Sequence, residues 1–165
     1  DTPIETMFKL YPWEWMMSEE FGERIPGSNV RFIEPGWKAI LSNKGLLPLL
    51  WEMFEGHPNL LPAYFDGDPA ATALEGNYVR KPLFSREGAN IEFFEGGEQT
   101  INIDGDYGAE GHIVQALNPL PHFNGNYPMI GSWLVASQPC GICIREDATL
   151  VTGDDARFVP HIILG

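Results

Sequence analysis

The sequence has few cysteines and few cations. Its 165 residues include only Cys140 and Cys143, and ten lysine and arginine residues stand against twenty-three aspartate and glutamate residues. Two cysteines are too few for a disulfide-rich scaffold and are compatible with a reducing compartment. The formal net charge of -13 opposes long-range attraction to nucleic acid and anionic lipid, so we expect neither a nucleic-acid partner nor a membrane partner.

Long apolar runs and a secretory leader are lacking as well. No apolar run approaches the roughly 20 residues that a helix needs to cross a bilayer. The opening DTPIETMFKLYPWEW has neither a basic start nor an apolar signal core. We therefore expect a cytoplasmic location. Because the chain begins at Asp1 and its aromatic start needs a surface to pack on, we expect a segment of a longer polypeptide that forms one domain or part of one.

The pattern of apolar and turn-forming residues predicts an α+β fold, with a mainly antiparallel sheet in the second half of the chain. Helical spacing predicts one helix within 11–21 and another over 46–54, with Pro48 in its first turn and Gly56 after its end. Alternating apolar residues between turn formers predict the sheet. Its strands are expected at 78–82, 91–94, 112–117, 129–136 and 141–145, and shorter elements are expected as a strand beginning near 30, a strand in LLPAYF and a helix near 70–74.

Lys44 lies at or just before the start of the second predicted helix. The helix dipole favours negative charge at that end, so a lysine there is unusual. An anion that arrives from outside would explain it. The simpler alternative is a solvated side chain.

Three cations, Arg80, Lys81 and Arg86, crowd the stretch YVRKPLFSREGANI at 78–91. Strand alternation places Arg80 on one face and Lys81 on the other, beside Val79. A lysine that projects from a strand into a cleft can hold phosphate as a compact charge. The alternative is a lysine at a strand edge that extends its ammonium group into solvent.

The loop REGAN follows this strand and contains Gly88. Glycine permits close backbone approach, and successive amides can hold phosphate oxygens, as a lid over a triphosphate would. An ordinary hairpin loop has a similar composition. The phosphate-loop pattern GxxxxGK and the dinucleotide pattern GxGxxG after a strand are both absent.

Two further segments are candidates for binding. In HIVQALNPLP, the backbone of Gln115, Ala116 and Leu117 could pair with a flat base such as adenine, or the segment is simply a strand end. Arg145 follows the apolar stretch GICI. The planar guanidinium group of Arg145 suits a phosphate or a substrate carboxylate, while the structural alternative is an ion pair with Glu146, Asp147 or another carboxylate of the chain.

Metal and hydrolase patterns are weak. Cys140 and Cys143 have C-x-x-C spacing without a second Cys/His pair, and DGDYGAEG has an incomplete series of calcium ligands. The four histidines are scattered and flank no evident nucleophile. We assign no metal ligand to this chain.

Taken together and in order, several segments resemble the C-terminal synthetase part of the glutathionylspermidine synthase family, in the type without an amidase domain. The matching stretches are LYPWEWM, EPGWKAILSNKGLLPLLWEMF, NLLPAYFD, YVRKPLFSREGANI, IVQALNPLPHFNGNYPMIGSWLV and GICIREDATLVTGDDARFVPHII. They cover nearly the whole chain. The resemblance implies that 1–165 form the C-terminal portion of an ATP-grasp-like synthetase domain whose upstream part is absent.

The resemblance also implies an ATP-dependent carboxylate-amine ligase that forms an amide through an acyl phosphate. At matching positions, it implies that Lys44 and Lys81 bind ATP phosphates, and that Gln115, Ala116 and Leu117 surround the adenine. It implies that Arg86 acts in the loop that closes over the site and that Arg145 acts near the transferred phosphate or the acid. Such cations would stabilise the charge of a transferring phosphoryl group.

The remaining expectations follow from the same resemblance. The implied substrates are a glutathione-like acid and a polyamine-like amine, and the implied cofactors are ATP and Mg²⁺, whose ligands are expected upstream of this chain. We expect the isolated segment to hold part of the nucleotide site without completing catalysis. The rival hypothesis is a non-catalytic binding module of the same fold, whose acidic surface attracts a polyamine or a protein.

Overall fold

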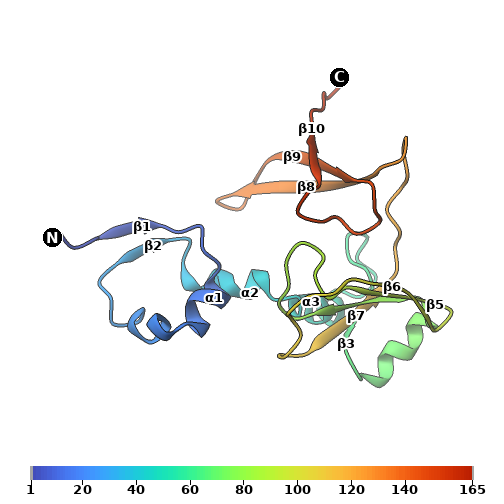
Figure 1. Cartoon of the computed structure of the whole chain (residues 1–165), viewed down its shortest axis with the longest axis horizontal. Coiled ribbons are helices and arrows are strands. Elements are labelled where there is room, and N and C mark those ends of the chain that lie inside the picture. Colours follow the sequence, from blue (N-terminus) through green and yellow to red (C-terminus); the bar gives the residue numbers. More distant parts are fainter. Residues whose placement is uncertain (1, 165) are drawn as a thin grey trace.

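The computed structural model describes residues 2–164. These residues form three sheets and a few short helices (Figure 1). The two larger sheets are antiparallel. The prediction of an α+β fold with antiparallel sheet in the second half is therefore confirmed.

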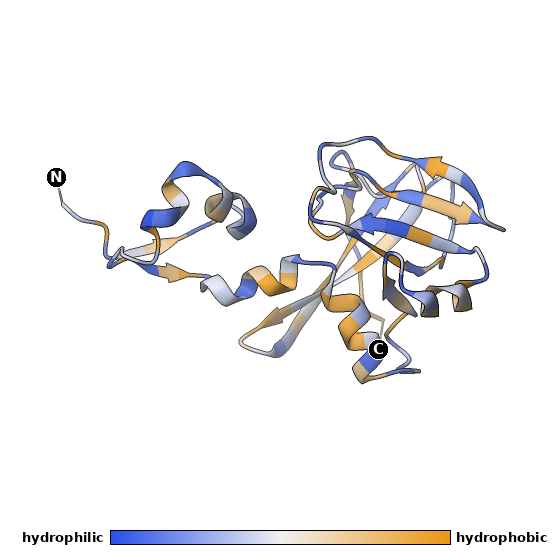
Figure 2. Cartoon of the chain, turned by 90° about the horizontal axis from the view of Figure 1, so that it is seen from below, coloured by the Kyte–Doolittle hydropathy of each residue, from blue (hydrophilic) through white to orange (hydrophobic). Residues whose placement is uncertain are grey.

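The N-terminal part contains a parallel pair of strands and short helices. Its elements are β1 (Thr6–Phe8), α1 (Trp13–Ser18), η1 (Glu20–Arg24), β2 (Arg31–Ile33), η2 (Gly36–Lys38) and α2 (Ala39–Ser42). Trp13 is buried, packs edge-on against Phe32 and donates its indole N–H to the Glu34 carbonyl at 3.2 Å. The predicted helix within 11–21 is shorter than expected because Glu19 adopts an extended conformation that ends α1. In both overall views this part lies to one side of the two larger sheets (Figures 1 and 2).

The central sheet has the strand order β3-β7-β4-β5-β6. Its strands are β3 (Ala63–Phe65), β4 (Tyr78–Pro82), β5 (Glu92–Glu95), β6 (Glu98–Asn102) and β7 (His112–Ala116). The register aligns Ala63, Gln115, Val79 and Phe93 in one row across four strands, and all four are buried. Hydrophobic and hydrophilic segments alternate along the strands (Figure 2). Three residues of this row, Gln115, Val79 and Phe93, form part of the floor of the candidate site.

Helices α3 (Leu46–Met53) and η3 (Pro69–Leu74) flank the central sheet, and α3 contacts β3. The third sheet has the order β10-β9-β8, with β8 (Tyr127–Val135), β9 (Gln138–Asp147) and β10 (Arg157–Val159). Ala136 and Ser137 join β8 to β9 with φ values of 49° and 64°, as the hairpin turns that match strand twist require. This sheet lies over the central sheet in Figure 1.

Most predicted elements are confirmed, with corrected ends. The strand at 78–82 has the predicted bounds, and the other four predicted strands of the second half correspond to β5, β7, β8 and β9. The expected strands near 30 and in LLPAYF are β2 and β3, the helix near 70–74 is the 3₁₀ helix η3, and the helix over 46–54 is α3. Strands β1, β6 and β10 were not predicted. Within residues 2–164, none of the helices combines the length and apolar character needed to cross a membrane.

Candidate functional site

A cavity of about 250 Å³ lies between the central sheet and the third sheet. Its floor consists of Val79, Lys81, Phe93 and Gln115 from β4, β5 and β7. Its other walls come from the loop after β4, the segment after β7, β8 and the connection between β9 and β10. The residues that line these walls include Gly88, Ile91, Leu117, Pro119, Met129, Leu150, Val151 and Thr152. The cavity is therefore largely apolar, with Lys81 as its charged group.

Lys81 extends into this cavity from β4, which lies between β7 and β5. The alternative of a lysine at a sheet edge is therefore wrong. Its Nζ donates to Gln115 Oε1 at 2.8 Å. Among the described residues Lys81 forms no salt bridge. Burial, with a smaller contribution from the charge of Lys44, lowers the pKa of Lys81 to about 8. A buried ammonium group without a carboxylate is costly, and an anion would stabilise it.

Lys44 lies just before α3, as predicted, but its side chain is held by the loop after β4. Its Nζ donates to the carbonyl oxygen and to Oγ of Ser85, at 2.9 and 2.8 Å. Burial lowers the pKa of Lys44, the charge of Arg86 lowers it further, and Glu14 opposes the shift. Lys44 in turn lowers the pKa of Lys81. The charge of Arg86 therefore acts on Lys44, and the charge of Lys44 acts on Lys81.

Arg86 does not line this cavity. Its Nη2 forms an ion pair with Glu14 Oε1 at 2.6 Å, and its guanidinium group lies 5.6 Å from the ring centre of Trp15. Glu14 Oε2 is buried and finds no hydrogen-bond partner in the part of the chain that the structure describes. Sequence analysis missed Glu14, because nothing in a chain rich in glutamate distinguishes the one that pairs with an arginine 72 positions away.

The loop after β4 is shaped by left-handed backbone conformations. Glu87, Gly88 and Asn90 have φ values of 55°, 79° and 54°. A Cβ atom on Gly88 would lie 2.5 Å from Val151 Cγ1. Glycine therefore lets this loop pack directly against the connection between β9 and β10.

We expect Gly88→Ala to lower the free energy of unfolding by about 1–2 kcal/mol, because alanine is strained at this φ and its methyl group collides with Val151. Hydrogen exchange should become faster at 148–153. Gly67→Ala is the matched control, since Gly67 has a φ of 86° but nothing within 4 Å of the added Cβ. Equal losses in both variants, with unchanged exchange at 148–153, would contradict a close contact between the two loops.

Gln115, Ala116 and Leu117 all line the cavity, but two of their backbone amides are already bonded. Ala116 N–H donates to the Pro62 carbonyl at 2.8 Å, and Leu117 N–H donates to the Asn77 carbonyl at 3.2 Å. Proline has no N–H, so Pro62 cannot return the second bond of an antiparallel pair to the Ala116 carbonyl. The amides of Ala116 and Leu117 are therefore engaged within the protein and do not face a ligand as free donors.

Arg145 and Asp147 in β9 shape the wall of the cavity rather than its interior. Arg145 Nη2 donates to the Gly153 carbonyl at 2.8 Å. Asp147 accepts bonds from the N–H groups of Thr149 and Gly153 at 2.9 and 3.0 Å, and these backbone bonds lower its pKa. The expected alternative, an ion pair of Arg145 with Glu146, Asp147 or another carboxylate, is not found among the described residues. Glu146 pairs with Arg157 instead, at 2.8 Å.

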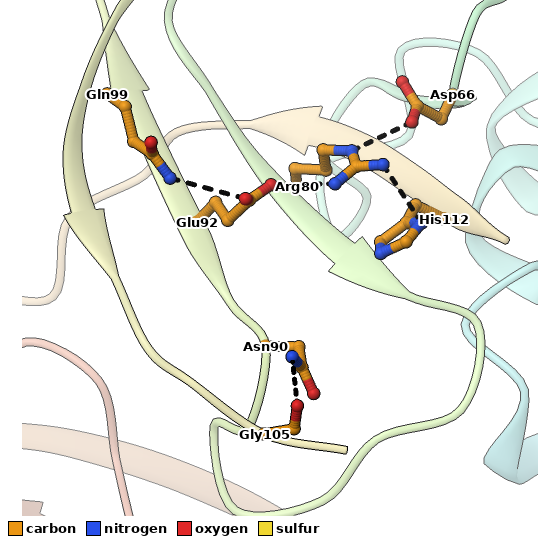
Figure 3. A network of polar contacts seen from close by, with 7 residues as sticks. All are labelled: Asp66, Arg80, Asn90, Glu92, Gln99, Gly105 and His112. Carbon is orange, nitrogen blue, oxygen red and sulfur yellow. Dashed lines mark hydrogen bonds and ion pairs between the residues drawn. The ribbon is translucent and has the colours of Figure 1, made fainter. Parts of the chain in front are cut away.

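The opposite face of the central sheet carries a separate polar network around Arg80 (Figure 3). Arg80 Nε and Nη1 each lie 2.9 Å from a carboxylate oxygen, of Asp66 and of Glu92 respectively, and Nη2 lies 3.1 Å from His112 Nδ1. Burial, followed by the charge of Arg80, lowers the pKa of His112. Alternation thus separates Arg80 from Lys81 as predicted, and each of the three guanidinium nitrogens of Arg80 has a partner within the protein.

The predicted site residues therefore fall into three groups. Lys81, Gln115, Ala116 and Leu117 line one cavity, Lys44 and Arg86 lie on the neighbouring loop, and Arg145 lies behind the cavity wall. Within 2–164, no group of three or more histidine, cysteine or acidic side chains is arranged to hold a metal ion. The arrangement suits an anionic ligand with an apolar portion.

The chain is similar to one protein family and to several known proteins. A family model described as glutathionylspermidine synthase pre-ATP-grasp matches residues 1–164. A Haemophilus influenzae protein described provisionally as an acid–amine ligase is 46% identical over 98% of this chain and 42% of its own length. Trypanothione synthetase of Crithidia fasciculata is 30% identical over 94% of this chain and 27% of its own length. The bifunctional glutathionylspermidine synthetase/amidase of Escherichia coli is 30% identical over 82% of this chain and 22% of its own length.

The chain thus spans less than half the length of these relatives. The predicted family is confirmed, whereas the predicted position in the C-terminal portion of a synthetase domain stays a prediction. The family model covers nearly every residue, and the chain belongs to the glutathionylspermidine synthase family, in the part that this model describes as pre-ATP-grasp.

Proposed function

We propose that this chain supplies part of the nucleotide site of an ATP-dependent acid–amine ligase. The observation that carries the proposal is the buried ammonium group of Lys81, which faces a largely apolar cavity and has no carboxylate partner among residues 2–164. A nucleoside triphosphate requires an apolar surface for its base and a nearby cation for its phosphates, and this cavity combines the two.

In this proposal the adenine lies in the cavity between the two antiparallel sheets, as an ATP-grasp-like fold would place it. The volume of about 250 Å³ is below the range of about 300–1,000 Å³ that is typical of whole ligand pockets, so it suits the base and not the triphosphate. The Ala116 carbonyl, which receives no bond from Pro62, accepts the exocyclic amine of adenine. The phosphates extend from Lys81 towards Lys44 and Arg86.

The reaction that we propose has two steps. A carboxylate oxygen of the acid attacks the γ-phosphorus, and the bond to the bridging oxygen breaks as ADP leaves with the electron pair. The nitrogen of the amine then attacks the acyl carbon, phosphate leaves, and the nitrogen loses a proton to complete the amide. Lys44, Lys81 and Arg86 stabilise the transferring charge, while Arg145 acts by holding the wall at Gly153.

The substrates in this proposal are a glutathione-like acid and a polyamine-like amine, as the names of the relatives suggest. Mg²⁺ would accompany the triphosphate, and we assign no residue of this chain to it because the described residues offer no cluster of ligands. A cytoplasmic location fits the two free thiols, Cys140 and Cys143.

Calorimetric titration with Mg-ATP tests the nucleotide site. We expect saturable binding of one nucleotide, and weaker binding of Mg-ITP, which presents an oxygen acceptor in place of the adenine amine opposite the Ala116 carbonyl. Equal affinity for ATP and ITP would contradict the role of that carbonyl.

The rival function is a non-catalytic module that attracts a polyamine through its excess of thirteen negative charges. Spermidine is therefore titrated in parallel. Binding of spermidine without any binding of Mg-ATP would overturn the ligase proposal and favour the module.

A further inference from the structure

Gln115 in β7 is a polar residue in the interior of the central sheet. Its exposed fraction is 8%, and within 2–164 no other polar or charged residue is buried to this degree. A buried amide is costly unless it is hydrogen-bonded. Lys81 Nζ donates to Gln115 Oε1 at 2.8 Å. This contact therefore offsets part of the cost of burying the carboxamide.

The two residues lie on neighbouring inner strands of the sheet. Gln115 is paired with Ala63 in β3 and with Val79 in β4. Lys81 follows Val79 by two positions, so its side chain leaves the same face of the sheet as that of Gln115. Diagonal neighbours of this kind are within reach of long side chains. Because inner strands hold their side chains more precisely than loops do, Gln115 fixes the direction in which the Lys81 ammonium group points.

The carboxamide of Gln115 holds this ammonium group without neutralising it. An ammonium group has three N–H donors, and among the described residues Gln115 is the one hydrogen-bond partner of Lys81 Nζ. Within 2–164 no acidic residue lines the cavity, and Lys44, the charged group that acts on Lys81, has the same sign. Two donors and the whole charge therefore remain for the oxygen atoms of an anion.

We propose that Gln115 is a positioning residue for Lys81, which it holds through a neutral acceptor so that the ammonium group meets a nucleotide phosphate with its charge intact. The inference rests on the proposed function, because the anion that Lys81 meets is the triphosphate. A glutamate at this position would hold Lys81 as well, but its carboxylate would neutralise the ammonium group and repel phosphate. A side chain without an acceptor would leave the ammonium group free to turn away from phosphate.

Two substitutions that nearly preserve side-chain size, Gln115→Glu and Gln115→Met, test this assignment in the whole chain. The pKa of Lys81 is followed by the NMR signal of its ε-carbon, and the Kd for Mg-ATP is measured by calorimetry. Gln115→Glu should raise the pKa of Lys81 above its wild-type value of about 8, because a carboxylate favours the charged form. Gln115→Met should lower this pKa, because the charged form loses a hydrogen bond.

The Kd for Mg-ATP should nevertheless rise in both variants. At about pH 7 we expect an increase of about tenfold in Gln115→Glu, where the carboxylate competes with phosphate, and of about three- to tenfold in Gln115→Met. A residue that only packs within the sheet would change stability in both variants without moving the pKa of Lys81 in opposite directions.

Gln138→Glu and Gln138→Met are the matched controls, since Gln138 in β9 is exposed and does not line the cavity. They should leave both the pKa of Lys81 and the Kd for Mg-ATP unchanged. If the wild type binds Mg-ATP, an identical Lys81 pKa or an identical Kd in wild type and both Gln115 variants would overturn the inference and leave the proposed function intact. Failure of the wild type to bind Mg-ATP would overturn both.

Discussion

Replacing Lys81 with methionine should weaken the binding of Mg-ATP by about 10- to 100-fold, as measured by calorimetry. Methionine keeps most of the aliphatic stem but removes the ammonium group, and a hydrogen bond to a charged group is worth about 1.5–3 kcal/mol. Lys81 is the charged group on the floor of the proposed nucleotide cavity, where Gln115 is its hydrogen-bond partner.

The same substitution should stabilise the chain in the absence of nucleotide. Burial disfavours the charged form of Lys81 and lowers its pKa from 10.5 to about 8, so folding at neutral pH costs free energy that the neutral methionine side chain does not require. Differential scanning calorimetry should therefore show a higher melting temperature for Lys81→Met. Lower affinity combined with higher stability would distinguish a binding lysine from a structural one.

The free energy of unfolding of the wild-type chain should rise with pH in the range where Lys81 titrates, because the pKa of Lys81 is lowered in the folded chain. Between about pH 8 and pH 10.5 the folded chain holds fewer protons at Lys81 than the unfolded chain. This group therefore makes the free energy of unfolding rise with pH, by on the order of 3 kcal/mol at most. Lys44, whose pKa is also lowered, contributes in the same direction. The affinity for Mg-ATP should fall over the same range, because the neutral amine attracts phosphate less.

Lys38→Met is the control for Lys81→Met, since it removes the same charge outside the nucleotide cavity. The difference in stability between wild type and Lys81→Met should shrink as the pH rises above about 8. Lys38→Met should leave the affinity for Mg-ATP unchanged. Unaltered Mg-ATP affinity in Lys81→Met, in a chain whose wild type binds the nucleotide, would contradict the proposed role of this lysine.

Replacing the adjacent cation, Arg80, should have the opposite consequences. We expect Arg80→Met to lower the free energy of unfolding by about 2 kcal/mol, or about 4–8 °C in melting temperature. The substitution leaves Asp66, Glu92 and His112 without their shared partner (Figure 3). The side chains of Asp66 and Glu92 are 40% and 24% exposed, so solvent screening keeps the loss below that of a fully buried ion pair. Mg-ATP affinity should not change.

Arg157→Met is the control for Arg80→Met. Arg157 forms an ion pair with Glu146, and the Arg157 side chain is 66% exposed. An exposed pair of this kind contributes about 0–1 kcal/mol to the free energy of unfolding. Thermal melts of the two variants should therefore differ clearly. A similar small loss in both would show that the network around Arg80 contributes little to stability, and a loss of nucleotide affinity in Arg80→Met would contradict the separation of the two faces of β4.

The predicted strands show which part of the fold depends on local pattern. The strand at 78–82 has clear alternation between turn formers, and its bounds agree with β4. Strand β6 was missed because its sequence, EQTIN, is polar, and it pairs at the edge of the sheet with β5 alone. Its strand conformation depends on a partner more than on its own residues.

The candidate site likewise depends on contacts between residues that are distant in the sequence. Sequence pattern and resemblance made Lys81 and Gln115 candidates for the site, but they did not predict the hydrogen bond of 2.8 Å between these two residues, which are 34 positions apart. Glu14 escaped notice because its role depends entirely on Arg86. The partner of a charged residue is set by the fold, which brings distant residues together, so the sequence alone does not reveal it.

The sequence by itself determined the α+β class, the family, and the opposite directions of Arg80 and Lys81, because alternation along a strand is a local property of the backbone. Only the tertiary structure decided that Arg80 meets two carboxylates and a histidine while Lys81 meets a glutamine in a largely apolar cavity. The physical reason is the strand order: antiparallel pairing of β4 with β7 and β5 places distant residues on each face. The free energy of each charged group depends on those neighbours and on how deeply the group is buried.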